Sequence, residues 1–193
     1  MIDPIAEFNQ WLAEAVAHPA ISEPTAMTLA TATPQGMPSA RIVLLKKADA
    51  AGFLFYTNYT SLKSRQMLAN PFVALTFYWM PLGRQVRAEG SVQQAGADES
   101  DDYFASRPRA RQLGAWASLQ SQPLESREEL EARFTALAAE YEGKPIPRPP
   151  HWGGWRVVPR TVEFWTASDE RLHLRHVYTQ NAPGQWTDAL LYP

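Results

Sequence analysis

The sequence predicts a mainly β protein of the α+β class, built as an antiparallel β-barrel with helical insertions. Two observations lead to this expectation. Segments with strand-like patterning follow one another along most of the chain and are joined by short turns. This series is interrupted once, in the middle of the chain, by a block of helical patterning. Strands joined by short turns favour antiparallel pairing, so the helices are expected to be an insertion in a barrel.

The chain is expected to begin with an amphipathic helix over residues 4–17. Asp3 and Pro4 are typical of an N-cap followed by proline in the first helical turn. Apolar residues then recur at helical spacing, at Ile5, Phe8, Leu12 and Ala15. One face of this helix is therefore expected to pack against the sheet.

Strand-like segments occupy most of residues 26–93, before the helical block. Turn residues at Pro34-Gln35-Gly36 and at Ala50-Ala51-Gly52 separate the first of them, and Asn70-Pro71 ends a short helix. The predicted elements are a hairpin of residues 26–33 and 39–47, a strand at 53–58, a helix at about 61–69, and strands at 72–79 and 84–93.

The helical insertion is expected over about residues 98–142. Pro108 separates helices at 98–106 and 109–118, and Ser126 with Glu129 forms a capping box before a longer helix. Four prolines in six residues make 145–150 an extended connector. Strands are expected to resume at 155–158, 161–166, 172–178 and 186–191. We expect residues 1–193 to form a single domain.

Composition excludes several classes of function. The chain has 193 residues and a formal net charge of −2, which gives no general attraction to nucleic acid or to an anionic membrane. It contains no cysteine, so disulfides, thiolate metal sites and a cysteine nucleophile are excluded, and no metal is expected. Neither a signal peptide nor a membrane-spanning apolar run is visible, so a cytoplasmic location is expected.

A group of cations near the C-terminus indicates an anion site. In a strand, Arg171, His173 and Arg175 would share one face, with Leu172 and Leu174 on the other. Two permanent cations beside an imidazole suit an anionic aromatic ligand. For this short segment alone, a solvated edge strand is the favoured explanation, and the rest of the chain shifts the balance toward an anion site.

Two other segments are also candidates for binding an anion, and each has an ordinary structural explanation as well. Residues 41–46 form a buried-looking strand with a cation at each end, which is also common in protein cores. Ser61 and Lys63 lie at the start of a helix, where free N–H groups favour a phosphate, although a capped helix is common without one. We expect Arg41, Lys63, Arg107 and Arg171 to line a common cavity.

Taken together, these segments resemble the pyridoxine (pyridoxamine) 5′-phosphate oxidase family. The resemblance covers essentially the whole chain. It rests on the joint order and spacing of RIVLLK, FYTN, RQVR, YFASRPR, GAWAS, PPHWGG, and EFW with RLH.

The resemblance implies an FMN-binding split barrel and a homodimer with the FMN sites between its subunits. It also implies oxidation of pyridoxine or pyridoxamine 5′-phosphate to pyridoxal 5′-phosphate, with O2 as acceptor and H2O2 as product. Arg171 and His173 match the catalytic pair that covers the pyridine ring and positions its C4′ carbon against flavin N5. The positions matching FMN contacts are Arg41, Ile42, Val43, Leu44, Leu45, Lys46, Tyr56, Thr57, Lys63, Gln85, Gln120, Ser121, Trp165 and Arg175. The positions matching substrate contacts are Lys46, Tyr103, Arg107, Arg111, Arg171 and His173.

Several residues depart from the family pattern. Leu62 replaces an expected arginine near the FMN phosphate, Arg111 replaces a serine near the substrate phosphate, and Leu174 replaces an acidic residue. Leu190 stands where an arginine is common, and the N-terminal extension of many members is lacking. Two alternatives follow: a related flavin oxidase acting on another cyclic substrate, or a protein that binds FMN or pyridoxal phosphate with weak catalysis.

Overall fold

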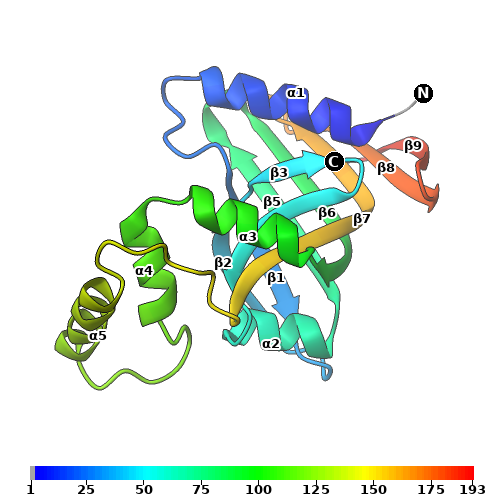
Figure 1. Ribbon diagram of the computed structural model, residues 1–193. Helices are drawn as coiled ribbons and strands as arrows, with labels where there is room; N and C mark the ends of the chain where they lie inside the picture. Colours follow the sequence, from blue (N-terminus) through cyan, green and yellow to red (C-terminus); the bar gives the residue numbers. More distant parts are fainter. Residues whose placement is uncertain (1–2) are drawn as a thin grey trace.

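The computed structural model describes residues 3–193 and shows a curved antiparallel sheet with five α-helices in that part of the chain (Figure 1). The strands are β1 Ala26–Ala32, β2 Pro38–Leu44, β3 Lys47–Asp49, β4 Gly52–Asn58, β5 Phe72–Trp79, β6 Arg84–Gln94, β7 Trp152–Thr166, β8 Leu174–Ala182 and β9 Gln185–Leu191. The helices are α1 Pro4–Ala17, α2 Leu62–Ala69, α3 Ala97–Ser106, α4 Arg109–Ala117 and α5 Arg127–Glu140.

The sheet curls into a half-barrel because its two ends belong to consecutive strands. The strand order is β2-β1-β5-β6-β7-β4-β3, and β8 and β9 continue outward from β7. The chain passes from β2 at one end to β3 at the other through Leu45 and Lys46. The backbone N–H of Lys46 donates to the carbonyl of Leu54 on β4 at 2.8 Å. The two end strands, β2 and β3, are therefore linked by the chain itself and not by strand pairing, and this leaves the barrel split.

Helix α1 covers one opening of the barrel, as Figure 1 shows. The Asp3 side chain caps the helix by accepting hydrogen bonds from the N–H groups of Ile5 and Ala6. Phe8 is fully buried and packs against Phe53 and Phe77, with ring centroids 5.0 and 4.8 Å apart. The predicted N-cap and apolar face are therefore confirmed.

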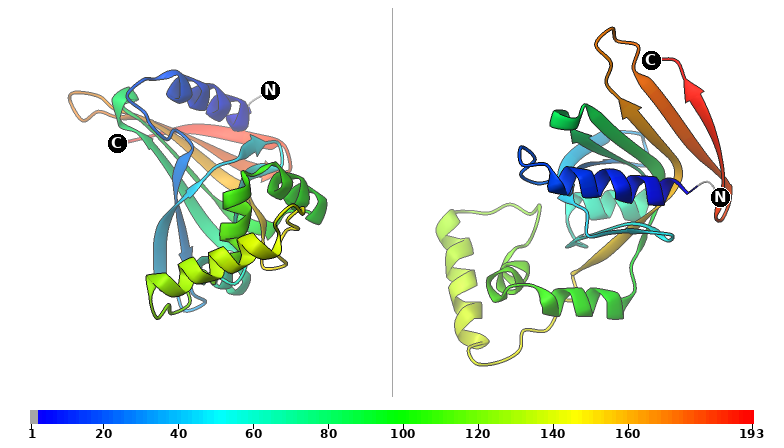
Figure 2. Two further views of the ribbon diagram at one scale, coloured as in Figure 1. Left: turned by 60° about the vertical axis from the view of Figure 1, so that its left-hand side comes forward. Right: turned by 90° about the horizontal axis from the view of Figure 1, so that it is seen from above.

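The helical insertion lies beside the barrel. Helices α4 and α5 form a lobe that stands away from the strands, while α3 runs along the barrel wall (Figure 2). A second apolar cluster joins the insertion to the start of β7 through Phe104, Leu113, Ile146 and Trp152. This cluster positions the helices next to β4, which matters for the site described below.

Two predicted strand boundaries are wrong. Residues 39–47 do not form one strand: β2 ends at Leu44 and Lys47 opens β3, because the Leu45 side chain turns into the core. Residues 155–158 and 161–166 are not separate strands but parts of β7, which continues past Pro159. The register of β6 shifts beside it, between Glu89 and Gly90. An added Cβ on Gly90 would lie 2.0 Å from the carbonyl oxygen of Val158, so glycine permits this close approach.

The polar C-terminal segment also differs from its prediction. The strand expected at 172–178 is β8, which begins at Leu174, and Arg171 and His173 precede it. Arg171 has a left-handed backbone conformation with φ of 60°, which is incompatible with a strand. Strand alternation therefore does not explain where these two side chains lie.

Within residues 3–193, no helix combines the length and hydropathy needed to cross a membrane.

Candidate active site

A cleft of about 580 Å³ lies between β2, β4, α2 and the helical insertion. Eleven of the predicted site residues line it. They are Ile42, Val43, Leu44, Lys46, Tyr56, Thr57, Lys63, Tyr103, Arg107, Arg111 and Gln120. These residues come from five separate segments of the chain, which only the fold brings together.

Lys63 lines the cleft beside the first turn of α2, which we call the α2 end. Ser61 caps α2 by accepting a hydrogen bond from the N–H of Ser64, so the first turn of the helix is held against β4. The Lys63 ammonium donates to Gln120 Oε1 at 2.8 Å and to Thr57 Oγ1 at 3.3 Å. Burial, together with the charge of Arg41, lowers the pKa of Lys63 to about 8. A cation held only by neutral groups favours an anionic ligand at this end.

Arg107 lines the cleft beside the C-terminus of α3, which we call the α3 end. Its guanidinium carbon lies 4.5 Å from the centroid of the Trp152 ring, and within the described chain its buried Nη1 atom has no hydrogen-bond partner. Burial lowers the pKa of Arg107, and the neighbouring charge of Arg111 acts in the same direction. An unpartnered buried donor in a cleft indicates a missing acceptor.

Stacked aromatic rings form a wall beside Arg107. Tyr56 and Tyr103 stack with centroids 4.0 Å apart, and Tyr56 stacks on Trp152 at 5.4 Å. Burial raises the pKa of Tyr56 to about 12, so its hydroxyl keeps its proton and donates to the carbonyl of Glu99. This end of the cleft thus combines flat apolar surfaces with a free cation.

Arg41 lies outside the lining of the cleft. Its guanidinium donates to Thr31 Oγ1 at 2.7 Å and to the carbonyl of Leu29 at 3.1 Å, behind β2. The expectation of a buried strand at 41–46 is wrong, because β2 is the end strand of the sheet and Ile42 is 63% exposed. Arg41 still influences the cleft, since its charge lowers the pKa of Lys63.

Five predicted site residues lie elsewhere, on three neighbouring strands and in the loop between β7 and β8. We call Gln85, Trp165, Arg171, His173 and Arg175 the β8 cluster. Gln85 on β6 pairs with Trp165 on β7, which pairs with Arg175 on β8. The loop that holds Arg171 and His173 lies far from α3, α4 and α5 in both views of Figure 2.

The β8 cluster is orientated by its own contacts. Arg175 forms a two-point ion pair with Glu163, with both N···O distances at 3.0 Å. His173 lies against Trp165, with ring centroids 4.6 Å apart, and its Nδ1 accepts a hydrogen bond from the N–H of Ser168 at 3.1 Å. An accepting Nδ1 assigns the proton of the neutral imidazole to Nε2, which is then a hydrogen-bond donor.

The predicted common cavity is not found within one protomer. Lys63 and Arg107 line the cleft, but Arg41 lies behind it and Arg171 belongs to the β8 cluster. Leu45 is buried in the core, and Ser121, with φ of 71°, lines a small adjacent cavity of about 200 Å³. Sixteen of the nineteen predicted residues therefore form two separate groups in the protomer, and Arg41, Leu45 and Ser121 belong to neither.

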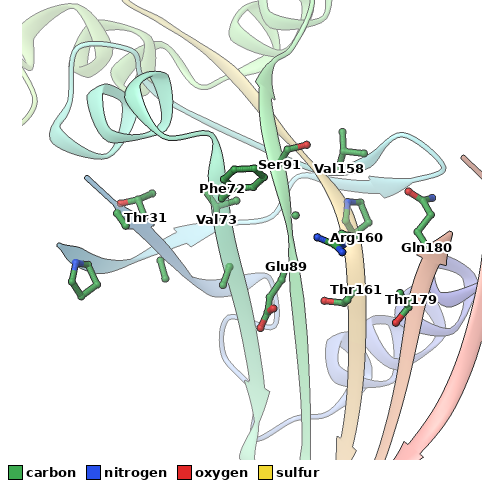
Figure 3. A pocket seen from close by; sticks show the side chains of 16 residues that line it. Thr31, Phe72, Val73, Glu89, Ser91, Val158, Arg160, Thr161, Thr179 and Gln180 are labelled. Carbon is green, nitrogen blue, oxygen red and sulfur yellow. The ribbon is translucent and has the colours of Figure 1, made fainter. Parts of the chain in front are cut away.

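A larger groove of about 710 Å³ crosses the outer face of the sheet (Figure 3). It is lined by β1, β5, β6, β7 and β8, with Phe72, Val158 and Arg160 among its labelled side chains. None of the predicted site residues lines it. Size alone would favour this groove, but the unpartnered cation and the stacked rings favour the smaller cleft.

The cleft fits an anionic, aromatic group. Four cationic side chains line it, Lys46, Lys63, Arg107 and Arg111, and no lining residue within the described chain is acidic. Cations free of carboxylate partners suit phosphate groups, which accept several charge-assisted hydrogen bonds. The fold and the cleft together define a split-barrel protein with a cleft whose lining is suited to a phosphorylated ligand.

Comparisons with known proteins agree with this class. The family model described as pyridoxamine 5′-phosphate oxidase matches residues 13–141, and that of the pyridoxine 5′-phosphate oxidase C-terminal dimerisation region matches residues 152–193. The chain is 56% identical over 191 residues to a pyridoxine/pyridoxamine 5′-phosphate oxidase from Rubrobacter xylanophilus, covering 99% of the chain and 87% of the relative. A protein of the same name from Myxococcus xanthus is 53% identical, with 99% of the chain and 92% of the relative covered.

Solved structures show the same fold. PhzG from Burkholderia lata, in complex with tetrahydrophenazine-1-carboxylic acid, is similar with a TM-score of 0.93 and 34% identity, covering 99% of this chain and 93% of PhzG. A pyridoxamine 5′-phosphate oxidase-related, FMN binding protein from Nostoc punctiforme superposes over the full length of both chains with a TM-score of 0.80 at 17% identity. The chain belongs to the pyridoxamine 5′-phosphate oxidase family and has its FMN-binding split-barrel fold. It is thereby an oxidoreductase of a flavoprotein family with a C-terminal dimerisation region.

Sequence reasoning missed several residues of the two groups. Trp152 and Asn58 line the cleft, although only the segments that contain them were singled out. Glu163 holds Arg175, and Thr31 with Gln66 holds Arg41. The run PPHWGG was a usable signal for Trp152. Nothing local in the sequence links Thr31 to Arg41, because their contact depends on strand pairing.

Proposed function

We propose that the protein oxidises pyridoxine 5′-phosphate or pyridoxamine 5′-phosphate to pyridoxal 5′-phosphate, with FMN as cofactor and O2 as acceptor, giving H2O2. The observation that carries this proposal is one cleft lined by four cations and by no acidic residue of the described chain. Two phosphorylated ring compounds require several such cations. The names of relatives at 53–56% identity support the same substrates.

Each end of the cleft is assigned to one phosphate. Lys63, with Thr57 and Gln120, holds the FMN phosphate near the start of α2, where helix N–H groups add partial positive charge. Arg107, Tyr103 and Arg111 hold the substrate phosphate, and Lys46 lines the cleft from the connection between β2 and β3. We propose that the other positions predicted to contact FMN also contact it in this protein.

FMN held by Lys63, Thr57 and Gln120 would supply the redox chemistry, which is hydride acceptance from the substrate and electron transfer to oxygen. The protein contributes binding and alignment, which account for much of the acceleration in such reactions. The Nε2–H of His173 and the guanidinium of Arg171 orient the substrate ring by donating hydrogen bonds. Since Nδ1 of His173 already accepts from the Ser168 amide, orientation fits this imidazole better than proton abstraction.

We also propose that a homodimer completes each site. The β8 cluster lies within residues 152–193, the region matched by the dimerisation model, except for Gln85 on β6. The second copy would bring its β8 cluster to the cleft of the first, so that one flavin contacts both subunits. This arrangement explains why the predicted residues form two groups in one protomer.

The absorbance spectrum of freshly purified protein tests the cofactor. A flavin spectrum that bleaches when pyridoxine 5′-phosphate is added without oxygen would report hydride transfer directly. On readmission of air, we expect pyridoxal 5′-phosphate and H2O2 in equal amounts. Protein that stays colourless with added FMN would contradict every flavin function.

A mixing experiment tests the shared site. Lys63→Met removes a cation from the cleft, and Arg171→Met removes one from the β8 cluster. After unfolding and refolding together, half of the dimers carry one of each chain, and each of these has one intact site. At an FMN concentration that fills wild-type sites but leaves Lys63→Met sites mostly empty, about a quarter of wild-type activity should therefore return on mixing. No recovery, although mixed dimers form, would contradict a site built from two subunits.

A second candidate is a related flavin oxidase acting on another cyclic substrate. The similarity to PhzG and the additional cation Arg111 favour it, because a guanidinium can bind a carboxylate as well as a phosphate. Identity to PhzG is 34%, lower than the 56% to the Rubrobacter oxidase. Comparing turnover of pyridoxine 5′-phosphate with that of a reduced tricyclic carboxylic acid decides between them.

The departures at Leu62 and Leu174 define a third candidate, a binding protein with weak catalysis. Both side chains are exposed, at 46% and 54%, so polar replacements fit without disturbing the core. If turnover is weak because of these residues, Leu62→Arg and Leu174→Asp should raise it. A gain in neither variant would count against damaged catalysis.

The single-domain organisation and the cytoplasmic location stay predictions.

A further inference from the structure

The guanidinium of Arg107 differs from those of Arg148 and Arg156 in the groups that contact it. Arg148 forms an ion pair with Asp101 at 2.6 Å, and Arg156 forms ion pairs with Asp49 and Glu99, each at 2.8 Å. Within residues 3–193 the Arg107 guanidinium has no such carboxylate, and its Nη1 has no hydrogen-bond partner although it is buried. Its close contacts are ring faces, Trp152 at 4.5 Å and Phe104 at 5.7 Å.

We propose that Trp152 is a positioning residue for the substrate phosphate, because its indole face holds the Arg107 guanidinium in place while leaving the N–H groups free for the anion. This inference rests on the proposed function and deepens it, since it names what selects a phosphorylated ligand at this end of the cleft.

Trp152 is itself held firmly enough to serve as a platform. It is 7% exposed and opens β7, where it pairs with Asn58 of β4. The backbone N–H of Trp152 donates to the carbonyl of Pro149, and the backbone carbonyl of Trp152 accepts a hydrogen bond from the Arg148 side chain at 2.7 Å. The indole also stacks with Tyr56, at 5.4 Å and 9° between ring planes. Strand pairing, a turn and a ring stack therefore fix the orientation of the indole face.

A ring face is better suited than a carboxylate to hold a phosphate-binding arginine. A carboxylate would occupy the donors of the guanidinium and repel the incoming anion. A ring face attracts the cation through its π-electrons and leaves the N–H groups at the edge of the guanidinium plane available. The backbone of Arg107 is fixed as well, because its N–H donates to the carbonyl of Phe104 at the end of α3.

The test compares ring replacements at position 152 in the flavin-loaded protein. Trp152→Phe keeps a weaker π-face, and Trp152→Leu removes it. We measure KM and kcat for pyridoxine 5′-phosphate, and the dissociation constant of inorganic phosphate by calorimetry. Trp152→Leu should raise both KM and the phosphate dissociation constant by about tenfold, with kcat changed by less than about threefold. Trp152→Phe should fall between Trp152→Leu and wild type.

Trp116→Leu is the matched control. Trp116 packs in the same apolar cluster, but it does not line the cleft and its indole N–H donates to the carbonyl of Pro147. It should lower stability without changing phosphate affinity. If Trp152→Leu fails to fold, tetrafluorotryptophan introduced at 152 by nonsense suppression keeps the shape while weakening the π-face, and it should weaken phosphate binding.

The proposal is overturned if folded, flavin-loaded Trp152→Leu or the fluorinated protein binds phosphate as tightly as wild type. It is also overturned if Arg107→Gln leaves the phosphate affinity of the wild-type protein unchanged. Failure of the proposed function gives a different result: wild-type protein that binds phosphate through Arg107 but does not turn over pyridoxine 5′-phosphate.

Discussion

The ammonium of Lys63 lies 2.8 Å from Oε1 of Gln120 and connects the first turn of α2 to the segment that follows α4. These residues are 57 positions apart, and both were predicted as FMN contacts. Their bond links the barrel to the helical insertion across the cleft. Because Gln120 is neutral, the bond orients the cation without cancelling its charge. The Lys63 ammonium is therefore positioned to bind an anion.

Replacing Lys63 by methionine should weaken FMN binding by roughly tenfold or more, because one charge-assisted hydrogen bond to phosphate is lost. The pKa of Lys63 is lowered to about 8, so the free wild-type protein loses this charge as the pH rises through 8. FMN affinity of the wild type should then fall between pH 7 and 9.5, while that of Lys63→Met stays nearly flat. Fluorescence titration of apoprotein measures both. A parallel fall in the two proteins would contradict this role.

The same substitution should stabilise the protein without flavin at pH 7. The unfolded chain holds the Lys63 proton up to its ordinary pKa of 10.5, whereas the folded chain releases it near 8. Folding is therefore penalised below pH 8, and the penalty is relieved as the pH rises from 8 toward 10.5. Thermal melts of apoprotein should show a higher Tm for Lys63→Met at pH 7 and a smaller difference at pH 10. Equal Tm differences at both pH values would argue against a buried charge.

Arg111→Ser should raise KM for pyridoxine 5′-phosphate by about threefold to tenfold with little change in kcat, because an exposed guanidinium near the phosphate is lost. Arg111 lines the cleft, and its charge lowers the pKa of Arg107. Steady-state kinetics decides the outcome. A fall in KM would instead show that Arg111 obstructs the pocket. Arg109→Ser is a suitable control, because Arg109 donates to the carbonyl of Lys144 away from the cleft.

Gly153→Ala and Gly114→Ala should change stability in opposite directions. A Cβ at Gly153 would lie 2.1 Å from the hydroxyl oxygen of Tyr59, so alanine forces this ring to move and should cost about 1–3 kcal/mol. Gly114 lies within α4 with open space around it, and alanine there should add about 0.5–1 kcal/mol. Denaturant unfolding of both variants measures the two effects. A stabilised Gly153→Ala would contradict the tight packing at the start of β7.

Tyr178→Phe should lower the free energy of unfolding by about 1 kcal/mol, because a hydrogen bond to a carboxylate is lost while the ring stays packed. The Tyr178 hydroxyl donates to Glu7 on α1 at 2.6 Å, and the residue is 8% exposed. This bond connects the first helix to β8. Urea unfolding measures the loss, and Tyr192→Phe, at a residue 94% exposed, should show none.

The spacing of residues along the chain was sufficient to predict the helix caps and the apolar face of α1. The cap at Asp3, the apolar positions Ile5 and Phe8, and the cap at Ser61 all appear in the structure as predicted. These features depend on residues within one or two helical turns of each other, so a short window of sequence contains the interactions that produce them. The family-specific runs likewise identified most of the cleft, because the residues that bind ligands occur in recognisable local patterns.

The arrangement of these patterns depended on contacts between distant residues. Pro159 lies within one long strand because β6 shifts its register at Gly90, and Arg171 leaves the strand because of its own left-handed backbone. The separation of the β8 cluster from the cleft follows from the order of strands in the sheet. Strand order, register and curvature arise from pairing between segments far apart in the chain. Local spacing therefore predicted the candidate site residues, and the pairing of strands determined which of them meet in one protomer.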